Sequence, residues 1–209
     1  VAVGSCCGLY SSSSWISTSV DGNTWIERTN PAAAISRELS KIIYAEDQFL
    51  AIGDNGTIVS SDDGITWGVQ SMDTLRYLRD IAYGNDKFVV IEGSYIHWSD
   101  NGSAWNNVSP TLPSNRYFST VMFGGGWFVI TTGANADYDG NEYVYTSTDG
   151  INWTQSATMY TGTTHGFTAD SHYLNGKYYV AGNLASKPYI FLSTDRVNWA
   201  KVLCSYGNT

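Results

Sequence analysis

One short phrase recurs five times in this chain and always ends in tryptophan. It reads STSVDGNTW, SSDDGITW, WSDNGSAW, STDGINW and STDRVNW, and the copies end at Trp25, Trp67, Trp105, Trp153 and Trp199. Successive tryptophans are 42, 38, 48 and 46 residues apart. Repeats of this length indicate supersecondary units that bury their faces against neighbouring units. The recurrence therefore predicts five repeated units.

The residues between the tryptophans read as short β-strands. Segments 42–54, 81–93, 121–133 and 172–183 each contain an apolar strand, a turn of Gly, Asn or acidic residues, and a second strand that starts at an aromatic residue. Gly and Asn accept the positive φ of tight hairpin turns. A third strand leads into each phrase, and a fourth starts at each tryptophan. Each unit is therefore predicted to hold four antiparallel strands.

Four-stranded units of this length, repeated around an axis, predict an all-β fold, a five-bladed β-propeller in a single domain. The predicted units are 1–38, 39–79, 80–119, 120–168 and 169–209. Residues 1–5 match only the second strand of a unit, so the first unit lacks its innermost strand and the C-terminal tail is the natural donor. The tail, residues 205–209, lies only a few residues after Trp199, which leaves little chain to reach the first unit. Either the tail closes the ring by a short path or the chain continues beyond Thr209.

Composition and charge exclude some classes of binding partner. Charged residues are 14% of the chain, the net charge is −8, and Lys and Arg form no cluster. Because binding to a phosphate backbone needs clustered cations, nucleic acid is not a predicted partner. No apolar stretch approaches the roughly 18 residues of a membrane span. The chain starts at Val1 without Met or a signal-like segment, which favours a mature form or a fragment.

The three cysteines lie near the two ends of the chain, at Cys6, Cys7 and Cys204. Their spacing fits no zinc site. Two interpretations stay open. They are free thiols, or Cys204 forms a disulfide with Cys6 or Cys7, which would imply an oxidising compartment.

The repeated phrase resembles the Asp-box, or bacterial neuraminidase repeat, of sialidase-type propellers. That motif reads Ser-x-Asp-x-Gly-x-Thr-Trp, and all five copies here are one residue shorter. The compressed form is similar to that of many bacterial and phage surface propellers. The resemblance extends along nearly the whole chain and implies a propeller fold. It implies little about activity, because one fold supports many functions.

Each residue type in the phrase has a predicted structural role. The acidic or amide side chain accepts backbone N–H groups of its own turn, the glycine adopts positive φ, and the tryptophan packs between blades. The paired positions are Asp21 and Trp25, Asp63 and Trp67, Asn101 and Trp105, Asp149 and Trp153, and Asp195 and Trp199. Arg196 replaces the glycine in the fifth copy and is predicted to be a strained or altered turn. In Asp-box proteins these hairpins lie away from the catalytic face, so the acids are not predicted to be catalytic.

The loops between blades vary, and variable loops on a rigid scaffold are where binding residues concentrate. Alignment of the repeats places cationic residues at one position, just before each innermost strand, next to aromatic residues. The candidate ligand-binding residues are Arg37, Arg76, Tyr77, Arg116, Tyr117 and His165. A ring of this kind at the mouth of the central channel would bind a carboxylate or a sugar. Alternatively, each arginine bonds carbonyls of the neighbouring blade and serves the fold.

A second variable loop, 133–142, is rich in oxygen ligands. Asp137, Asp139, Asn141 and Glu142 lie close together in sequence and form a group of the type that Ca²⁺ prefers. The alternative is a solvated hairpin tip. Ca²⁺ is therefore a possible ligand, and no other cofactor is predicted.

These observations favour a non-catalytic binding or adhesion propeller that recognises a glycan or a protein ligand through its variable-loop face. The predicted location is extracellular, at a cell surface or on a virion. One alternative is a structural module of a larger extracellular or phage-tail protein. A second is a sialidase-like glycoside hydrolase, in which Arg37, Arg76 and Arg116 would replace the arginine triad that the resemblance implies. Most glycosidases also need two carboxylates beside the scissile bond, and the sequence nominates no such pair.

Overall fold

The computed structural model describes residues 1–7, 12–31, 38–72, 74–134, 141–162, 166–184 and 187–203, and these ranges contain β-strands and no α-helix. The strands form five antiparallel sheets, one of three strands and four of four strands. We number these sheets as blades 1 to 5 in chain order.

The strands of each blade follow one another along the chain. Blade 1 contains β1 (Ala2–Cys7), β2 (Ser12–Thr18) and β3 (Ile26–Arg28). Blade 2 contains β4 (Leu39–Ala45), β5 (Gln48–Gly53), β6 (Thr57–Ser61) and β7 (Gly68–Ser71). Blade 3 contains β8 (Asp80–Gly84), β9 (Lys87–Glu92), β10 (Tyr95–Ser99) and β11 (Asn106–Val108). Blade 4 contains β12 (Arg116–Gly124), β13 (Trp127–Ala134), β14 (Glu142–Ser147) and β15 (Thr154–Tyr160). Blade 5 contains β16 (Gly166–Leu174), β17 (Lys177–Leu184), β18 (Lys187–Ser193) and β19 (Ala200–Leu203).

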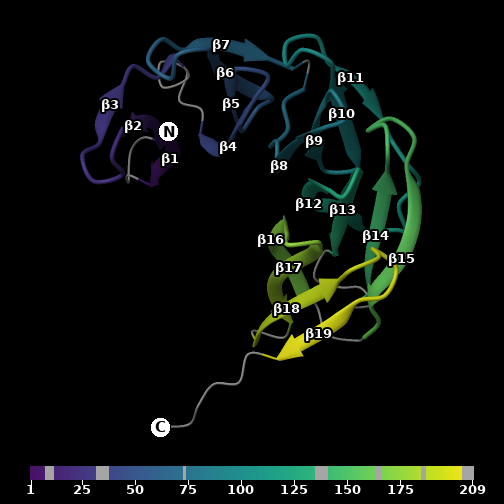
Figure 1. The fold of residues 1–209 in the computed structure, drawn as a ribbon. Coiled ribbons are helices and arrows are strands. Elements are labelled where there is room, and N and C mark those ends of the chain that lie inside the picture. The colour runs from purple at the N-terminus through teal and green to yellow at the C-terminus, as the bar shows by residue number, and fades with distance from the viewer. Residues whose placement is uncertain are drawn as a thin grey trace, which may run out of the picture.

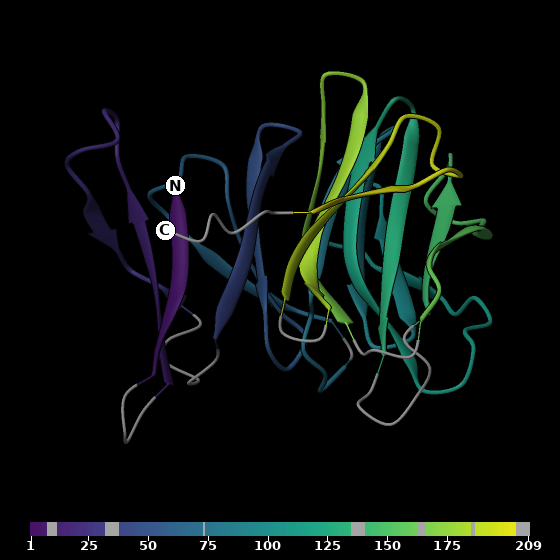
Figure 2. The same cartoon turned by 90° about the horizontal axis from the view of Figure 1, so that it is seen from below.

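The blades follow an arc around a common centre (Figure 1), with blades 1 and 5 at its two ends. Strands β4, β8, β12 and β16 lie on the inner side of the arc, and Figure 2 shows that the strands run along its axis. The predicted all-β, five-bladed propeller is confirmed, and blade 1 lacks an innermost strand as expected. The tail expected to supply that strand lies at 204–209, outside the described residues. Strands β12 and β16 begin at Arg116 and Gly166, ahead of the predicted unit boundaries at 120 and 169.

Neighbouring blades are held together by apolar clusters, and the phrase tryptophans take part in each. Blade k presents what we call its leading face to the preceding blade and its trailing face to the next one. Trp67 of blade 2 packs with Ile16 of blade 1 and is 8% exposed. Trp105, Trp153 and Trp199 pack in the same way against the clusters shared with blades 2, 3 and 4. The predicted packing role of these four tryptophans is confirmed.

The turn that precedes each tryptophan is built by its serine and its acidic or amide residue. In the fourth copy, Asp149 Oδ1 accepts the N–H groups of Ile151 and Asn152 at 2.9 and 2.8 Å, and Ser147 Oγ accepts the N–H of Gly150 at 2.9 Å. The same pattern recurs at Asp21, Asp63, Asn101 and Asp195. These bonds favour the ionised carboxylate, and they lower the pKa of Asp63 to about 2. The acids are turn-builders, as predicted.

The fifth copy keeps the same turn although it lacks the glycine. Arg196 has a φ of 67°, close to the 70 to 77° of the corresponding glycines in the other copies. A positive φ is uncommon for a residue with a Cβ, so the predicted strain at this position is confirmed. The Arg196 guanidinium lies 4.5 Å from the centre of the Trp127 ring, and this contact offsets part of the cost.

Removing the acceptor at one of these turns should destabilise the propeller. We expect Asp149→Ala to lower the free energy of unfolding by about 1–3 kcal/mol, because several donors lose a charged acceptor. Asp149→Asn should lose less than half as much, since Asn101 serves the same turn in the third copy. Urea unfolding at pH 7 measures both, with the exposed Asp62→Ala as control. Equal losses for the alanine and asparagine variants would contradict the role of the acceptor oxygen.

Candidate functional site

The four innermost strands bring one residue each to the same level of the channel. These four residues are equivalent by strand register. Each pairs with the residue at the same position of the second strand of its own blade, namely Ile52, Ile91, Thr131 and Ala181. The residues are Lys41 on β4, Asp80 on β8, Thr120 on β12 and Asp170 on β16, and we call them the inner ring. A register shift precedes the ring residue in blades 2, 4 and 5. Such bulges redirect side chains, so they help to define this level of the channel.

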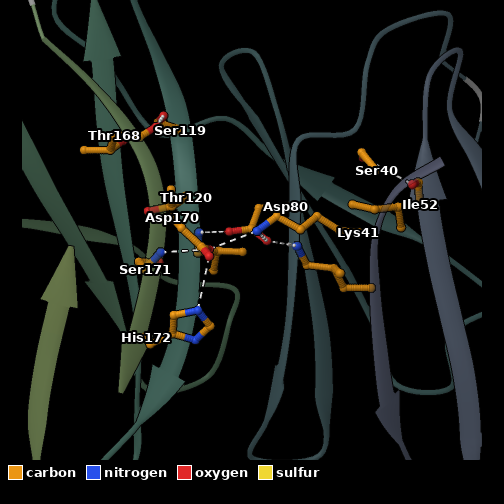
Figure 3. A network of polar contacts seen from close by, with 12 residues as sticks. Ser40, Lys41, Ile52, Asp80, Ser119, Thr120, Thr168, Asp170, Ser171 and His172 are labelled. Atoms are coloured by element: carbon orange, nitrogen blue, oxygen red, sulfur yellow. Dashed lines mark hydrogen bonds and ion pairs between the residues drawn. The ribbon is translucent and has the colours of Figure 1, made fainter. Parts of the chain in front are cut away.

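A lysine joins two carboxylates within the inner ring (Figure 3). Lys41 Nζ lies 2.9 Å from Asp170 Oδ1 and 3.8 Å from Asp80 Oδ1. Backbone groups also hold both carboxylates. Asp80 accepts the N–H of Val121 in blade 4 at 2.9 Å, and Asp170 accepts the N–H of Ser171 at 3.0 Å. One polar network therefore ties blades 2, 3, 4 and 5 together at the centre of the arc.

Hydroxyl groups extend this network on the side of blades 4 and 5. Thr120 Oγ1 lies 2.8 Å from Thr131 Oγ1, which is 3.1 Å from Thr168 Oγ1. Ser119 Oγ donates to the Thr168 carbonyl at 2.8 Å. Away from the threonines, His172 Nε2 lies 3.2 Å from Asp170 Oδ2. The inner ring is therefore supported by neighbours that fix its side chains.

The two carboxylates of the inner ring differ in their protonation. Burial raises the pKa of Asp80 to about 6, against the opposing effect of Lys41. Asp170 is less buried, and its hydrogen bond and charge interaction with Lys41 hold its pKa below the usual value despite partial burial. Burial alone would lower the pKa of Lys41, but Asp80 and Asp170 raise it. Lys41 is therefore a fixed ammonium beside one ionised carboxylate and one that titrates near pH 6.

A cavity of about 320 Å³ lies between the four innermost strands. Lys41, Asp80 and Asp170 line its polar part, and Tyr83, Phe123 and Tyr173 line its aromatic part. Each innermost strand runs from the variable-loop side to the hairpin turn, so the aromatic part is nearer the hairpins. The rings of Phe123 and Tyr173 lie directly over Gly84 and Gly124 of the preceding blades. A Cβ on Gly124 would approach the Tyr173 ring to 2.0 Å, so a larger residue at this position would displace that ring from the side of the cavity.

The predicted arginines are found against tyrosines of their own blades. The exposed Arg76 has its guanidinium 5.9 Å from the ring centre of Tyr95, and the buried Arg116 lies 5.6 Å from that of Tyr143. Tyr95 and Tyr143 occupy equivalent positions, four residues before the serine of each turn. Each arginine therefore repeats the same contact with its blade, an arrangement typical of a feature that serves the fold.

The predicted tyrosines lie closer to the channel. Tyr77 is exposed and is near enough to Lys41 to contribute to its raised pKa. Tyr117 lies under the guanidinium of Arg79, 4.2 Å from its ring centre. The segments that lead into β8 and β12 make the same contact with the preceding blade. The Leu78 N–H donates to the Gly53 carbonyl, and the Phe118 N–H donates to the Gly93 carbonyl. Arg37 and His165 lie outside the described residues.

The predicted Ca²⁺ group is only partly described, since Asp137 and Asp139 lie outside the described residues. Glu142 is not at a solvated loop tip as the sequence suggested, because β14 begins at this residue and carries it into the interface of blades 4 and 5. Both of its carboxylate oxygens lie 3.1 Å from the Tyr189 hydroxyl. Asn141 accepts the N–H of Gly162 at 3.2 Å. In the described ranges, no three His, Cys, Asp or Glu side chains gather as a metal site.

Sequence reasoning missed the inner ring. Its members are the residues just before or at the start of the repeated strand pattern, and a Lys, two Asp and a Thr share no chemical type. Their common position in the repeat alignment was the one indication of the ring. The bulges break the alternation of inward and outward residues, so this position could not be recognised as inward-facing from the sequence. The loop arginines share a residue type and were therefore easier to recognise.

The architecture defines the chain as a β-propeller domain. Residues 7–127, more than half of the chain, match the model of the DUF6242 beta propeller domain, and the chain belongs to that family. No curated protein matches it significantly. No helix in the described ranges is long and apolar enough to cross a membrane.

Solved structures with the same fold are distant in sequence. YCF48 from Cyanidioschyzon merolae has a TM-score of 0.61 at 13% identity, over 93% of this chain and 70% of that one. YCF48 bound to D1 peptide has a TM-score of 0.58 at 15% identity, over 90% and 62%. Trypanosoma rangeli sialidase in complex with sialic acid has a TM-score of 0.57 at 13% identity, over 97% of this chain and 42% of that one. At these identities the likeness shows the fold alone.

Breaking the inner ring at Lys41 should leave Asp80 buried without its cation. We expect Lys41→Met to lower the free energy of unfolding at pH 7 by about 1–3 kcal/mol. Asp80→Asn in the Lys41→Met background should recover part of this loss. Lys87→Met, which breaks the ion pair with the exposed Asp100, should cost less than about 1 kcal/mol. A double-mutant cycle in urea measures the coupling, and strictly additive losses at Lys41 and Asp80 would contradict it.

The buried Glu142 should make stability depend on pH. Burial raises its pKa to about 7, so the folded protein holds a proton that the unfolded chain releases above pH 4.5. The stabilisation that this proton provides is complete at low pH and is lost as pH rises through 7. We expect Glu142→Gln to gain about 1–3 kcal/mol relative to the wild type between pH 5 and pH 8. Urea unfolding at both pH values tests this, with the exposed Glu27→Gln as control. A difference that does not change with pH would contradict the assignment.

Proposed function

We propose that this propeller is a non-catalytic binding domain that recognises a glycan or a protein ligand, with the central cavity as the polar centre of the site. The observation that carries the proposal is the cavity itself. It combines Lys41, Asp80 and Asp170, which their neighbours hold in place, with the rings of Tyr83, Phe123 and Tyr173. Concave sites with few fixed polar groups and apolar or aromatic walls are typical of ligand pockets.

The chemistry of the cavity suits a sugar. Carboxylate oxygens of Asp80 and Asp170 accept hydrogen bonds from hydroxyl groups, and the Lys41 ammonium donates them. Aromatic rings such as Tyr173 offer apolar faces, and the tyrosine hydroxyl adds a polar edge. A polar ligand with apolar C–H faces would satisfy both parts of the cavity. The volume of about 320 Å³ is at the lower end of the range for small-molecule sites.

The variable-loop face supplies a surface over which a longer ligand could extend. Leu75, Tyr77 and Tyr95 are exposed there beside Arg76. Tyr77 links this surface to the inner ring through its proximity to Lys41. The predicted binding residues Arg76, Tyr77, Arg116 and Tyr117, together with Arg37 and His165, remain part of this proposal.

Structures with this fold support both classes of ligand. The YCF48 structure holds a D1 peptide, and the Trypanosoma rangeli structure holds sialic acid. The present chain spans 62% of that YCF48 chain and 42% of the sialidase chain, so their ligands are only a guide. An extracellular, cell-surface or virion-associated location, a structural role in a larger appendage, and Ca²⁺ binding at Asp137 and Asp139 stay predictions.

Glycoside hydrolysis is the second candidate, and one observation favours it. The environments of Asp80 and Asp170 push their pKa values apart, as in pairs of an acid and a base or nucleophile. Against it, one lysine contacts both carboxylates and keeps Asp170 engaged in an ion pair. The two described arginines of the expected triad lie on tyrosines of separate blades. These contacts favour binding over catalysis.

A glycan array with matched variants tests the binding proposal. We expect Asp170→Asn to weaken binding of the recognised glycan at least tenfold, because a cavity acceptor loses its charge. Asp62→Asn makes the same charge change at an exposed hairpin and should bind as the wild type does. Binding that is unchanged in Asp170→Asn would overturn the assignment to the cavity.

Two further arms separate the alternatives. Arg76→Ala changes the variable-loop face and should reduce binding less than Asp170→Asn does. The reverse order would place the ligand on the loop face instead. Incubation with fluorogenic glycosides, a sialoside included, should show no turnover. Turnover that is lost in Asp80→Asn would establish the hydrolase and refute the non-catalytic proposal.

A further inference from the structure

Two polar side chains are buried in the otherwise apolar contact between blades 2 and 3. Glu92 ends β9 and His97 lies on β10, and they are 3% and 8% exposed. Glu92 is on the same side of β9 as Val90, which pairs with His97 across the two strands. Because Val90 packs in the cluster that blade 3 shares with blade 2, both polar side chains face blade 2. The leading face of blade 3 therefore carries a buried acid beside a buried base.

The facing atoms of this pair are unsatisfied. Glu92 Oε2 and His97 Nε2 lie 3.6 Å apart, and neither has a hydrogen-bond partner in the described part of the chain. Buried polar atoms almost always have a partner, so an unsatisfied pair calls for a physical reason. A protonated imidazole donates from both ring nitrogens. One added proton and a small closure of the distance would therefore join His97 to Glu92 by a charge-assisted hydrogen bond.

Arg76 is a second cation beside the same carboxylate. Its Nε lies 4.0 Å from Glu92 Oε1, and its side chain is 63% exposed. The backbone is fixed here, since the Arg76 carbonyl accepts the N–H of Gly56 in blade 2 at 2.9 Å. The side chain is held more loosely, with its guanidinium 5.9 Å from the ring centre of Tyr95. The guanidinium can therefore move while the backbone of the segment stays in place.

We propose that the Glu92 carboxylate is passed between these two cations as the pH changes. At neutral pH His97 is uncharged, and Glu92 holds Arg76 against the blade. In mildly acidic solution His97 gains a proton, bonds to Glu92 and releases Arg76 to solvent beside the exposed Leu75 and Tyr77. The variable-loop face then presents a free guanidinium, which can bind an anionic group. The switch is separate from the central cavity, so it holds whether or not the cavity binds a ligand.

The surroundings of the pair leave the exchange to these three groups. Blade 2 contributes apolar residues to this contact, among them Ile58. In the described ranges, no other charged side chain lies within 4.0 Å of Glu92 or His97. The polar groups that face the pair come from four elements, and they are Arg76 of the connection before β8, Glu92 of β9, Tyr95 of β10 and the uncharged Asn107 of β11.

Burial of His97 sets the direction and the pH range of the switch. It lowers the pKa of His97, and the charge of Glu92 opposes this effect only in part. The switch therefore operates below the ordinary histidine pKa of about 6.5. The unfolded chain takes up this proton more readily than the folded protein does. The contribution to stability is therefore complete above about pH 6.5, and it is lost as the pH falls through the lowered pKa.

Nuclear magnetic resonance tests the exchange in the folded protein. The His97 ring and the Arg76 Nε–H group should titrate together, with one midpoint below about pH 6.5. Glu92→Gln should lower the His97 midpoint by about one pH unit or more, because the ring loses its charged neighbour. The Nε–H of Arg79, which is stacked on Tyr117, should not change at this midpoint and serves as control. An Arg76 signal that stays constant while His97 titrates would overturn the proposal.

Two histidine variants identify the source of the Arg76 titration. His97→Gln removes the buried imidazole, so the Arg76 signal should stay constant between about pH 5 and pH 8. His172→Gln removes an exposed imidazole and should leave the titration of Arg76 as in the wild type. Circular dichroism confirms that each variant is folded. Glu92→Gln gives a second test at neutral pH, where its Arg76 signal should match that of the acidified wild type. An Arg76 titration that persists in His97→Gln, or a neutral-pH signal unchanged in Glu92→Gln, would refute the exchange.

Discussion

The contact between a leading face and the trailing face before it is the interaction on which the whole structure depends. A single four-stranded sheet has two apolar faces and cannot bury both alone, so each blade relies on its neighbours. The repeated tryptophan contributes one large ring per contact, buried at Trp67 and half-buried at Trp105, Trp153 and Trp199, and full burial of such a ring is worth about 2–3 kcal/mol of transfer free energy. Its turn, made by a serine and an aspartate such as Ser147 and Asp149, holds the ring at the outer edge of the blade.

Packing the blades around an arc has a consequence at its centre. The four innermost strands meet there, and residues of equal register, such as Lys41 and Asp80, come together although they are far apart in sequence. The bulges before Lys41, Thr120 and Asp170 add a local bend that helps to turn these side chains toward one another. The polar cavity is thus a product of blade packing and strand register, and no single loop builds it.

The fold was predictable because its signal is periodic, whereas the site was only partly predictable. Five copies of one phrase indicated five blades, and the strain at Arg196 followed from the glycine that it replaces. The predicted position of Glu142 in a loop is wrong, because β14 begins at this residue and pairs with β15 from there on. The inner ring was missed because its residues share a position and no chemistry. A repeat alignment can show such a position. The ion pairs and hydrogen bonds between its residues can be identified only when the three-dimensional strand register is known.

The charges of the inner ring narrow the kind of ligand that we propose for the cavity. Lys41 is shared between Asp170, which is ionised, and Asp80, whose pKa is raised to about 6. At neutral pH the cavity therefore carries an excess of negative charge in a partly buried space, and an anionic group would be repelled. Arg76 and Arg116, which could have attracted a carboxylate, contact tyrosines of their own blades. A neutral polar ligand, able to donate hydroxyl hydrogen bonds to the two aspartates, meets these constraints better than a sialic acid carboxylate does.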